Sequence, residues 1–116
     1  MTALRKAMEP IRIYLACPYS HKDPEVQERR YDIATRKAAD LMFAGHIVFS
    51  PITHSHPISH HLPEMGHDFW MRQDFAFLDW ADELWVCGID GFRESEGVNA
   101  EIDYALKHKM TVKILP

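Results

Sequence analysis

A serine, a glycine and a glutamate lie close together in the stretch Ser95–Tyr104, and together they could act on an anionic ligand. The run Glu83–Gly88 before it is short and apolar, as expected of a buried strand. The pattern after it is amphipathic, as expected of a helix. Ser95 would then be the N-cap, with Gly97 in the first turn and Glu101 about one and a half turns along. A helix start offers free N–H groups to small anions, and Glu101 adds a carboxylate suited to nucleophilic chemistry.

Each candidate also has an ordinary structural explanation. Glu101 could be a solvated helix glutamate, and Ser95 could serve only as a helix cap. Asp74 lies in a largely apolar helical pattern, where it either sits on an exposed edge or faces the site beside Glu101. In the second case, two neighbouring carboxyl groups would push their pKa values apart and could relay a proton. Tyr14 lies in the first apolar run and is typical of a buried tyrosine with a hydrogen-bonded hydroxyl.

The segment Thr53–His67 holds five of the eight histidines, and we expect it to be a long loop. A metal site is one alternative. The histidines lack the fixed helical spacing of a zinc protease, however, and no acid or thiol completes a familiar pattern. We therefore expect no bound metal. We expect the segment to form a pocket wall, with His54 and His56 contacting a base or a phosphate.

Length and composition restrict the class of protein. The chain has 116 residues, with 13 basic and 17 acidic side chains. This length predicts a single domain over 1–116, with a loose leader over 1–10. The mild acidity and the lack of a basic tract argue against nucleic acid as the partner. No apolar run reaches membrane-spanning length and no signal peptide is present, so we expect a cytoplasmic protein. Cys17 and Cys87 are expected to be small buried hydrophobes in a reducing compartment.

Strand-like and helix-like segments alternate along the chain. We expect strands over 11–17, 46–49, 83–88 and 111–115, and helices over 25–44, over 68–81 and from the Ser95 turn to about 109. This alternation predicts an α/β fold, a Rossmann/flavodoxin-like three-layer sandwich with a small parallel sheet of four to five strands and helices on both faces.

Ligands of such sheets bind beyond the carboxyl ends of the strands, where the strand order reverses. Three segments should meet there, namely 18–23, 51–67 and 88–95. The expected substrate-binding residues in or next to these segments are Pro18, Tyr19, Ser20, Pro51, His54, His56, Ser95, Glu96 and Gly97.

Four short motifs together resemble the nucleoside 2-deoxyribosyltransferase superfamily. That superfamily includes deoxynucleoside monophosphate and CMP N-glycosidases and several small bacterial families of unassigned function. The matching stretches are Ile13–Tyr19, Arg72–Phe75, Ala81–Val86 and Ser95–Ala105, and the last is the most specific. The resemblance spans nearly the whole chain after Pro10.

The resemblance implies roles for four residues. Glu101 matches the family's nucleophilic glutamate, and Asp74 matches an aspartate that assists the leaving base. Tyr14 matches a tyrosine that orients the nucleophile. Ser95 stands where the hydrolases have a phosphate-contacting serine and the transferases have an aspartate that binds sugar. A serine there favours a 5′-phosphorylated substrate.

The chain also departs from the family pattern. Cys17 replaces the usual glycine before the first proline, the histidine-rich segment is not a general family feature, and the C-terminal extension of the transferases is not expected. The implied function is hydrolysis of the N-glycosidic bond of a nucleoside 5′-monophosphate or related nucleotide, without a cofactor. The alternatives are a nucleoside 2-deoxyribosyltransferase, a non-catalytic nucleotide-binding module and a histidine-liganded metalloprotein. The apolar second helix and three tryptophans exceed what a small core needs, so we expect a homo-oligomer.

Overall fold

The computed structural model describes residues 10–116, so all but the last residue of the expected leader lies outside the described residues. Four strands form one sheet in the order β2-β1-β3-β4. Every neighbouring pair is parallel. The strands are β1 (Arg12–Ala16), β2 (Ile47–Phe49), β3 (Glu83–Cys87) and β4 (Thr111–Leu115). The predicted parallel α/β fold is confirmed.

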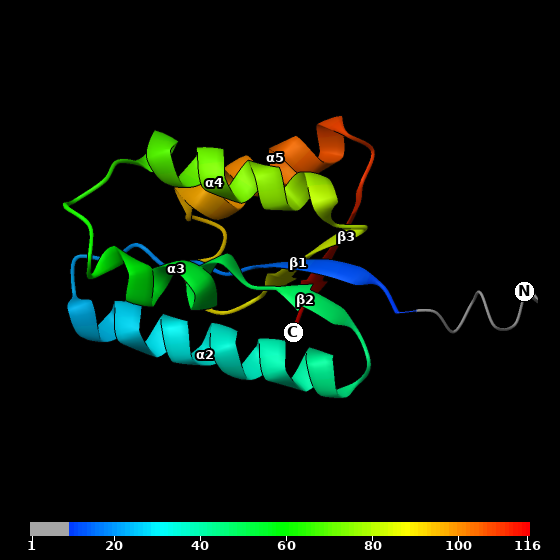
Figure 1. Cartoon of the computed structure of the whole chain (residues 1–116), viewed down its shortest axis with the longest axis horizontal. Helices are drawn as coiled ribbons and strands as arrows, with labels where there is room; N and C mark the ends of the chain where they lie inside the picture. The colour runs from blue at the N-terminus through cyan, green and yellow to red at the C-terminus, as the bar shows by residue number, and fades with distance from the viewer. Residues whose placement is uncertain (1–9) are drawn as a thin grey trace, which may run out of the picture.

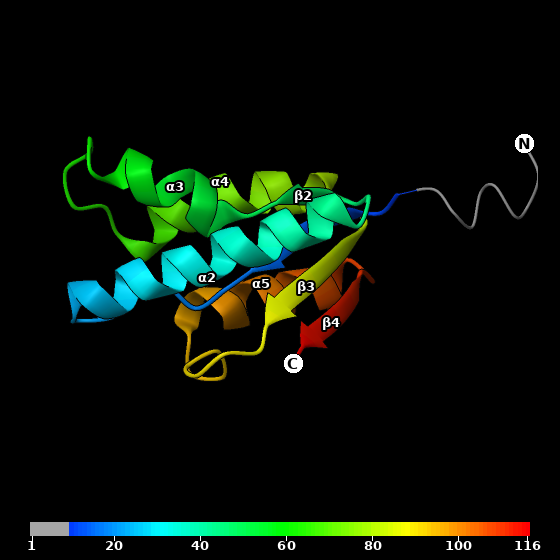
Figure 2. The ribbon, with the colours of Figure 1, turned by 90° about the horizontal axis from the view of Figure 1, so that it is seen from below.

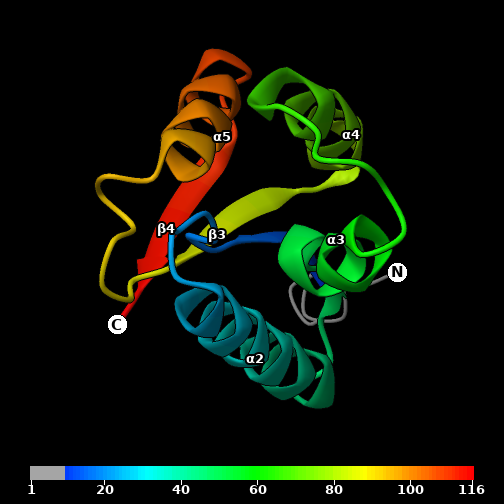
Figure 3. The same ribbon diagram turned by 90° about the vertical axis from the view of Figure 1, so that its left-hand side faces the viewer.

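Helices cover both faces of this sheet (Figures 1 and 3). The helix α2 (Pro24–Phe43) lies on one face, and α4 (His67–Trp80) and α5 (Glu96–Lys107) lie on the other. Figure 2 shows β3 and β4 side by side, with α5 connecting them. The chain moves from β1 outward to β2 in one direction and through β3 to β4 in the other. The strand order therefore reverses between β1 and β3, which is where such folds bind ligands.

The central strand β1 supplies both halves of the core because its side chains alternate between the two faces. Tyr14 and Ala16 pack with residues of α4 and α5, including Leu78 and Val98. Leu15 and Cys17 pack on the opposite face with Cys87 and with Ala34 and Ala38 of α2. Both cysteines are buried, as expected. Within residues 10–116, no helix has the length and apolar character needed to cross a bilayer.

The prediction of a long loop over Thr53–His67 is wrong for its first half, because Pro51–Ser59 form a helix, α3. Ser50 is its N-cap and accepts a hydrogen bond from the Thr53 amide at 3.3 Å, and Pro51 occupies the first turn, where a proline needs no amide partner. The second proline, Pro57, falls within the last turn. The two prolines and the polar composition are typical of a loop, so the sequence pattern did not indicate a helix here.

Candidate active site

A cavity of about 730 Å³ lies at the carboxyl edge of the sheet, where the strand order reverses. Its walls come from the segment after β1, the start of α2, α3, α4 and the start of α5. Figure 3 looks at the molecule from this side. The three segments that the sequence predicted to meet, 18–23, 51–67 and 88–95, all contribute residues to it.

Glu101 reaches this cavity because of its position on α5. Ser95 caps the helix by accepting a hydrogen bond from the Val98 amide at 3.2 Å. Val98, Glu101 and Ala105 are spaced by three and four residues, which places them on one face of the helix, and all three are buried. Glu101 is only 4% exposed and lines the cavity. The alternative of a solvated helix glutamate is therefore excluded.

Tyr14 lies behind Glu101, in the centre of β1. Its side chain is fully buried, and its hydroxyl donates a hydrogen bond to the Glu101 carboxylate. Burial, and next the nearby carboxylates, raise the pKa of Tyr14 well above its usual range. The phenol therefore stays protonated and remains a hydrogen-bond donor to Glu101.

Asp74 is the second acid of the cavity. It lies on α4 one turn before the buried Leu78, and it is only 8% exposed. Burial raises the pKa of Asp74 to about 7, although a hydrogen bond with Tyr14 opposes this rise. The exposed-edge alternative is excluded, and the aspartate faces the same cavity as Glu101.

Burial also raises the pKa of Glu101, to about 8, while the hydrogen bond from Tyr14 opposes this and the charge of Asp74 adds to it. Two buried carboxyl groups that share one tyrosine titrate as a pair. Near neutral pH the pair holds about one proton, so it can supply one carboxylate and one carboxylic acid together. This is the protonation state that a nucleophile and a neighbouring acid require.

Most of the other predicted site residues also line the cavity. They are Tyr19, Ser20, Pro51, His56, Ser95, Glu96 and Gly97. Pro18 is fully buried and does not line it. His54 is exposed, packs against Phe49 and Phe77, and lines a separate hollow of about 200 Å³. His54 and His56 lie about 200° apart around α3, so they cannot face the same cavity.

Sequence reasoning missed the contribution of α2 to the cavity. Arg30 lines the cavity and donates hydrogen bonds to the carbonyl of Ser20 at 3.0 Å and of Asp90 at 3.4 Å. It thereby links two of the three segments at this edge. Gly91 adopts a φ of 92° beside the Arg30 guanidinium, and a Cβ there would lie 2.4 Å from Nη2. Arg30 is one of several charged residues of α2, so nothing in the sequence distinguishes it from a solvated side chain.

The histidines of this region do not gather into a metal site. Within residues 10–116, no three His, Cys, Asp or Glu side chains are grouped as the ligands of a metal ion would be. Both ring nitrogens of His56 are already engaged, with Tyr19 and with Glu28. Nothing in this part of the chain favours the alternative of a histidine-liganded metalloprotein.

Comparison with known proteins agrees with this architecture. Residues 11–116 match the model of a family described as a domain of unknown function, DUF1937. The fold is similar to that of a 2-deoxyribosyltransferase from the psychrotolerant bacterium Bacillus psychrosaccharolyticus. The TM-score is 0.60 at 22% identity, over 89% of this chain and 70% of that one. No functionally curated protein matches the chain significantly. The chain therefore belongs to the DUF1937 family, and its fold is similar to that of a 2-deoxyribosyltransferase.

Proposed function

We propose that the protein is an enzyme that cleaves the N-glycosidic bond of a nucleoside or nucleotide, with Glu101 as the nucleophile. The observation that carries this proposal is the pair of buried acids that line one cavity, Glu101 and Asp74, together with the hydrogen bond from Tyr14 of β1 to Glu101. In the first step, a Glu101 carboxylate oxygen bonds to C1′ of the sugar while the C1′–N bond breaks. The base leaves with the bonding electron pair, and protonated Asp74 supplies the proton that it needs.

The glycosyl–enzyme ester formed in this step has two possible fates, and in both the attacking group gives its proton to the Asp74 carboxylate. In transfer, a nitrogen of a second base attacks C1′, Glu101 leaves as a carboxylate, and a new nucleoside results. The similarity in fold to a 2-deoxyribosyltransferase supports this fate. In hydrolysis, water attacks instead and the free sugar or sugar phosphate is released. Ser95 supports a 5′-phosphorylated substrate for this fate, because it lines the cavity beside the unpaired first amides of α5.

A panel of nucleosides and nucleoside 5′-monophosphates tests the proposal. Each is incubated alone and with an excess of a different free base, and the products are separated by chromatography. Release of base without an acceptor indicates hydrolysis, and a new nucleoside formed only with an acceptor indicates transfer. Binding without either product would leave the non-catalytic nucleotide-binding module as the function.

Two variants in α5 test whether the measured activity depends on Glu101. Glu101→Gln keeps the size of the side chain and removes the nucleophile, so we expect turnover to fall by about 10³-fold or more. Asp103→Asn removes an acid of the same helix whose side chain is exposed, and it should retain activity. Equal activity of the two variants would exclude Glu101 as the nucleophile.

A further inference from the structure

A second polar cluster lies on the cavity wall, and the proposed reaction does not use it. His56 of α3 is 7% exposed, and its two ring nitrogens each have a partner. Nδ1 lies 2.6 Å from the Tyr19 hydroxyl, and Nε2 lies 2.8 Å from a carboxylate oxygen of Glu28 on α2. Tyr19 and His56 line the cavity, whereas the Glu28 side chain is 67% exposed. The cluster thus runs from solvent through a buried imidazole to a phenol at the cavity.

The imidazole ring is held in place from several sides. Tyr31 stacks on it with ring centroids 4.2 Å apart and 26° between the planes. His60 meets it edge-on at 4.8 Å, and Tyr19 does so at 5.6 Å. The ring cannot tilt without losing these contacts. Because the packing holds the ring in one orientation, the two hydrogen bonds determine which ring nitrogen, Nδ1 or Nε2, carries a hydrogen.

Those bonds determine what Tyr19 can offer a ligand. An ionised Glu28 can only accept, so Nε2 of His56 carries a hydrogen. In a neutral imidazole, Nδ1 then has a lone pair and accepts the single hydroxyl proton of Tyr19. The Ser59 hydroxyl donates its hydrogen to the His56 carbonyl at 2.6 Å and therefore not to Tyr19. The Tyr19 oxygen is left with lone pairs only, so it can act toward the cavity only as an acceptor.

We propose that His56 is a positioning residue that makes Tyr19 an acceptor for an N–H group on the nucleobase edge, so that the site favours amino bases over their oxo counterparts. This rests on the proposed function, because it describes the substrate of the same cavity. Cytosine differs from uracil, and adenine from hypoxanthine, by an amino group in place of a carbonyl oxygen. A carbonyl oxygen facing the lone pairs of Tyr19 would leave two buried acceptors without a donor.

The first test is spectroscopic and needs no turnover. The ¹⁵N chemical shifts of the His56 ring, assigned by their loss in His56→Gln, report which nitrogen carries the hydrogen. We expect a neutral ring protonated at Nε2 at pH 7.5. A ring protonated at Nδ1, or at both nitrogens, would overturn the proposal, because Tyr19 would then keep its own proton for the ligand.

The second test exchanges the donor and acceptor roles along the hydrogen bonds of Glu28, His56 and Tyr19. Glu28→Lys replaces an acceptor by a donor, so Nε2 must accept and the hydrogen moves to Nδ1. Tyr19 then receives a hydrogen bond from His56 and can donate its hydroxyl proton to a carbonyl oxygen. The measured quantity is the ratio of kcat/KM for cytidine 5′-monophosphate to that for uridine 5′-monophosphate. We expect a ratio of about ten or more in the wild type, and a fall of about tenfold or more in Glu28→Lys.

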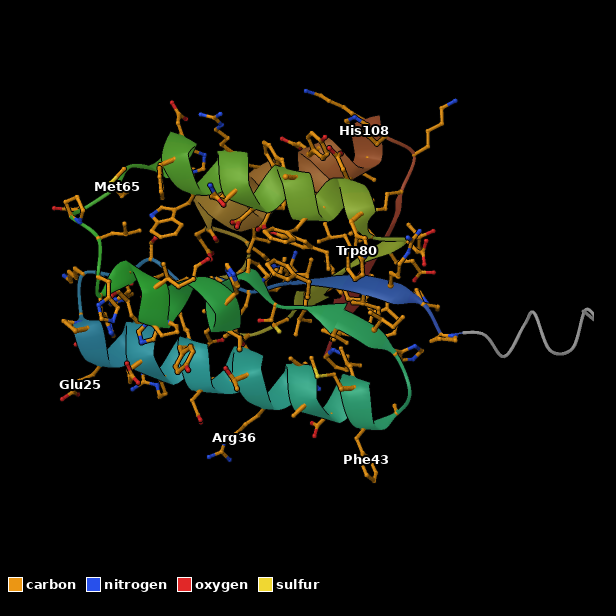
Figure 4. All side chains as sticks on the ribbon, viewed as in Figure 1. Glu25, Arg36, Phe43, Met65, Trp80 and His108 are labelled. Atoms are coloured by element: carbon orange, nitrogen blue, oxygen red, sulfur yellow. The ribbon has the colours of Figure 1, made fainter. Side chains whose placement is uncertain are left out.

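Two further variants act as controls. Glu25→Lys makes the same charge change on α2 at a side chain that points outward (Figure 4), so its ratio should equal that of the wild type. Tyr19→Phe removes the oxygen, and its ratio should fall toward one. An unchanged ratio in Glu28→Lys, with its Nδ1–H tautomer verified by ¹⁵N shifts, would overturn the proposal.

Failure of the proposed function would be distinguishable from failure of this inference. If the wild type converts no nucleoside or nucleotide, the affinities of the two monophosphates are compared by calorimetry in the wild type and in Glu28→Lys. A preference for the cytosine compound that Glu28→Lys reverses would support the inference for a binding site. Equal affinities in both proteins would overturn it.

Discussion

The single phenolic proton of Tyr14 faces two buried acids, and this imbalance sets the chemistry of the cavity. The structure gives the proton to Glu101, which stabilises the ionised form of that carboxylate. Burial raises the pKa of both acids, to about 7 for Asp74 and about 8 for Glu101, so the two carboxyl groups share a proton near neutral pH. The proposed reaction uses the pair with its proton on Asp74, so that Glu101 is the anion that attacks and Asp74 is the acid that assists the leaving base.

A bell-shaped dependence of kcat/KM on pH is the first prediction. Below about pH 7 the pair gains a second proton, so neither acid remains as the carboxylate that must attack. Above about pH 8 the pair loses its last proton and no acid remains for the base. We expect the maximum between these values, measured with a substrate whose base does not titrate in this range. A flat profile from pH 5 to pH 9 would contradict the assignment.

Replacing Tyr14 by phenylalanine gives the second prediction. The hydrogen bond from Tyr14 lowers the pKa of Glu101, so its loss should move the acidic limb of the profile to higher pH. Turnover at neutral pH should fall by about 10–100-fold, the range for a hydrogen bond to a charged group. Tyr104→Phe is the matched control, because Tyr104 also donates to a carboxylate, that of Asp79, outside the cavity. Identical profiles for the two variants would rule out the proposed role of Tyr14.

Among the strands, β3 and β4 lie very close to each other at their carboxyl ends. Gly88 follows β3 and donates its amide to the Leu115 carbonyl at 2.9 Å. A Cβ at this position would lie 2.2 Å from the same carbonyl oxygen. The backbone of β4 leaves no room for a side chain here. The glycine therefore lets the chain leave the sheet toward the segment that carries Gly91 and Ser95.

Gly88→Ala should accordingly lower the free energy of unfolding by about 1–3 kcal/mol, because the backbones of the two strands must separate. Gly66→Ala is the control, since a Cβ at Gly66 would have no atom within 4 Å, and its effect should stay below about 1 kcal/mol. Urea unfolding followed by circular dichroism measures both. Equal stability of the two variants would show that the strand ends can shift without cost.

At the scale of the whole molecule, the two buried acids make folding depend on pH. In the folded state the pKa of Asp74 is about 7 and that of Glu101 about 8, both above the usual range of an exposed carboxyl group. Between about pH 4 and pH 8 the folded chain therefore binds more protons at these sites than the unfolded chain does. The contribution of the pair to stability is complete below about pH 4 and is lost as the pH rises through the folded values.

Comparison of the wild type with the double variant Asp74→Asn, Glu101→Gln isolates this contribution. The difference in unfolding free energy should shift in favour of the variant as the pH rises from 5 to 8, by up to about 1.4 kcal/mol per pH unit for each group. Denaturant unfolding at several pH values measures it, and the other titrating groups cancel in the difference. A difference independent of pH would mean that the two acids keep ordinary pKa values in the folded protein.

The expectations of a homo-oligomer and of a cytoplasmic location stay predictions. Phe43 is 96% exposed at the end of α2 (Figure 4). Met42 before it and Ile47 at the start of β2 are about half exposed. These side chains could pack against another copy of the chain, as the apolar excess in the sequence suggested. Sedimentation velocity of the wild type and of Phe43→Ser would test this.

The local features of this protein can be predicted from the sequence alone. Short apolar runs identified all four strands, although only β1 and β3 are largely buried. The N-cap serine and helical spacing identified α5 and the position of Glu101 on it. Alternation of strands and helices then determined the parallel sheet and the edge at which a site forms. The resemblance in short motifs predicts Glu101, Asp74 and Tyr14 as site residues without information on their contacts.

Which of these residues meet, and in what protonation state, depends on how the elements pack against one another. The prolines of α3 argue against a helix in the sequence, so the placement of His54 and His56 on opposite faces of α3 could not be predicted. Arg30 and Glu28 are ordinary polar positions of α2 until α3 and the other segments pack beside them. Burial and hydrogen-bond partners set the pKa values of the acids and the tautomer of His56. These quantities depend on distances between residues that are far apart in the chain.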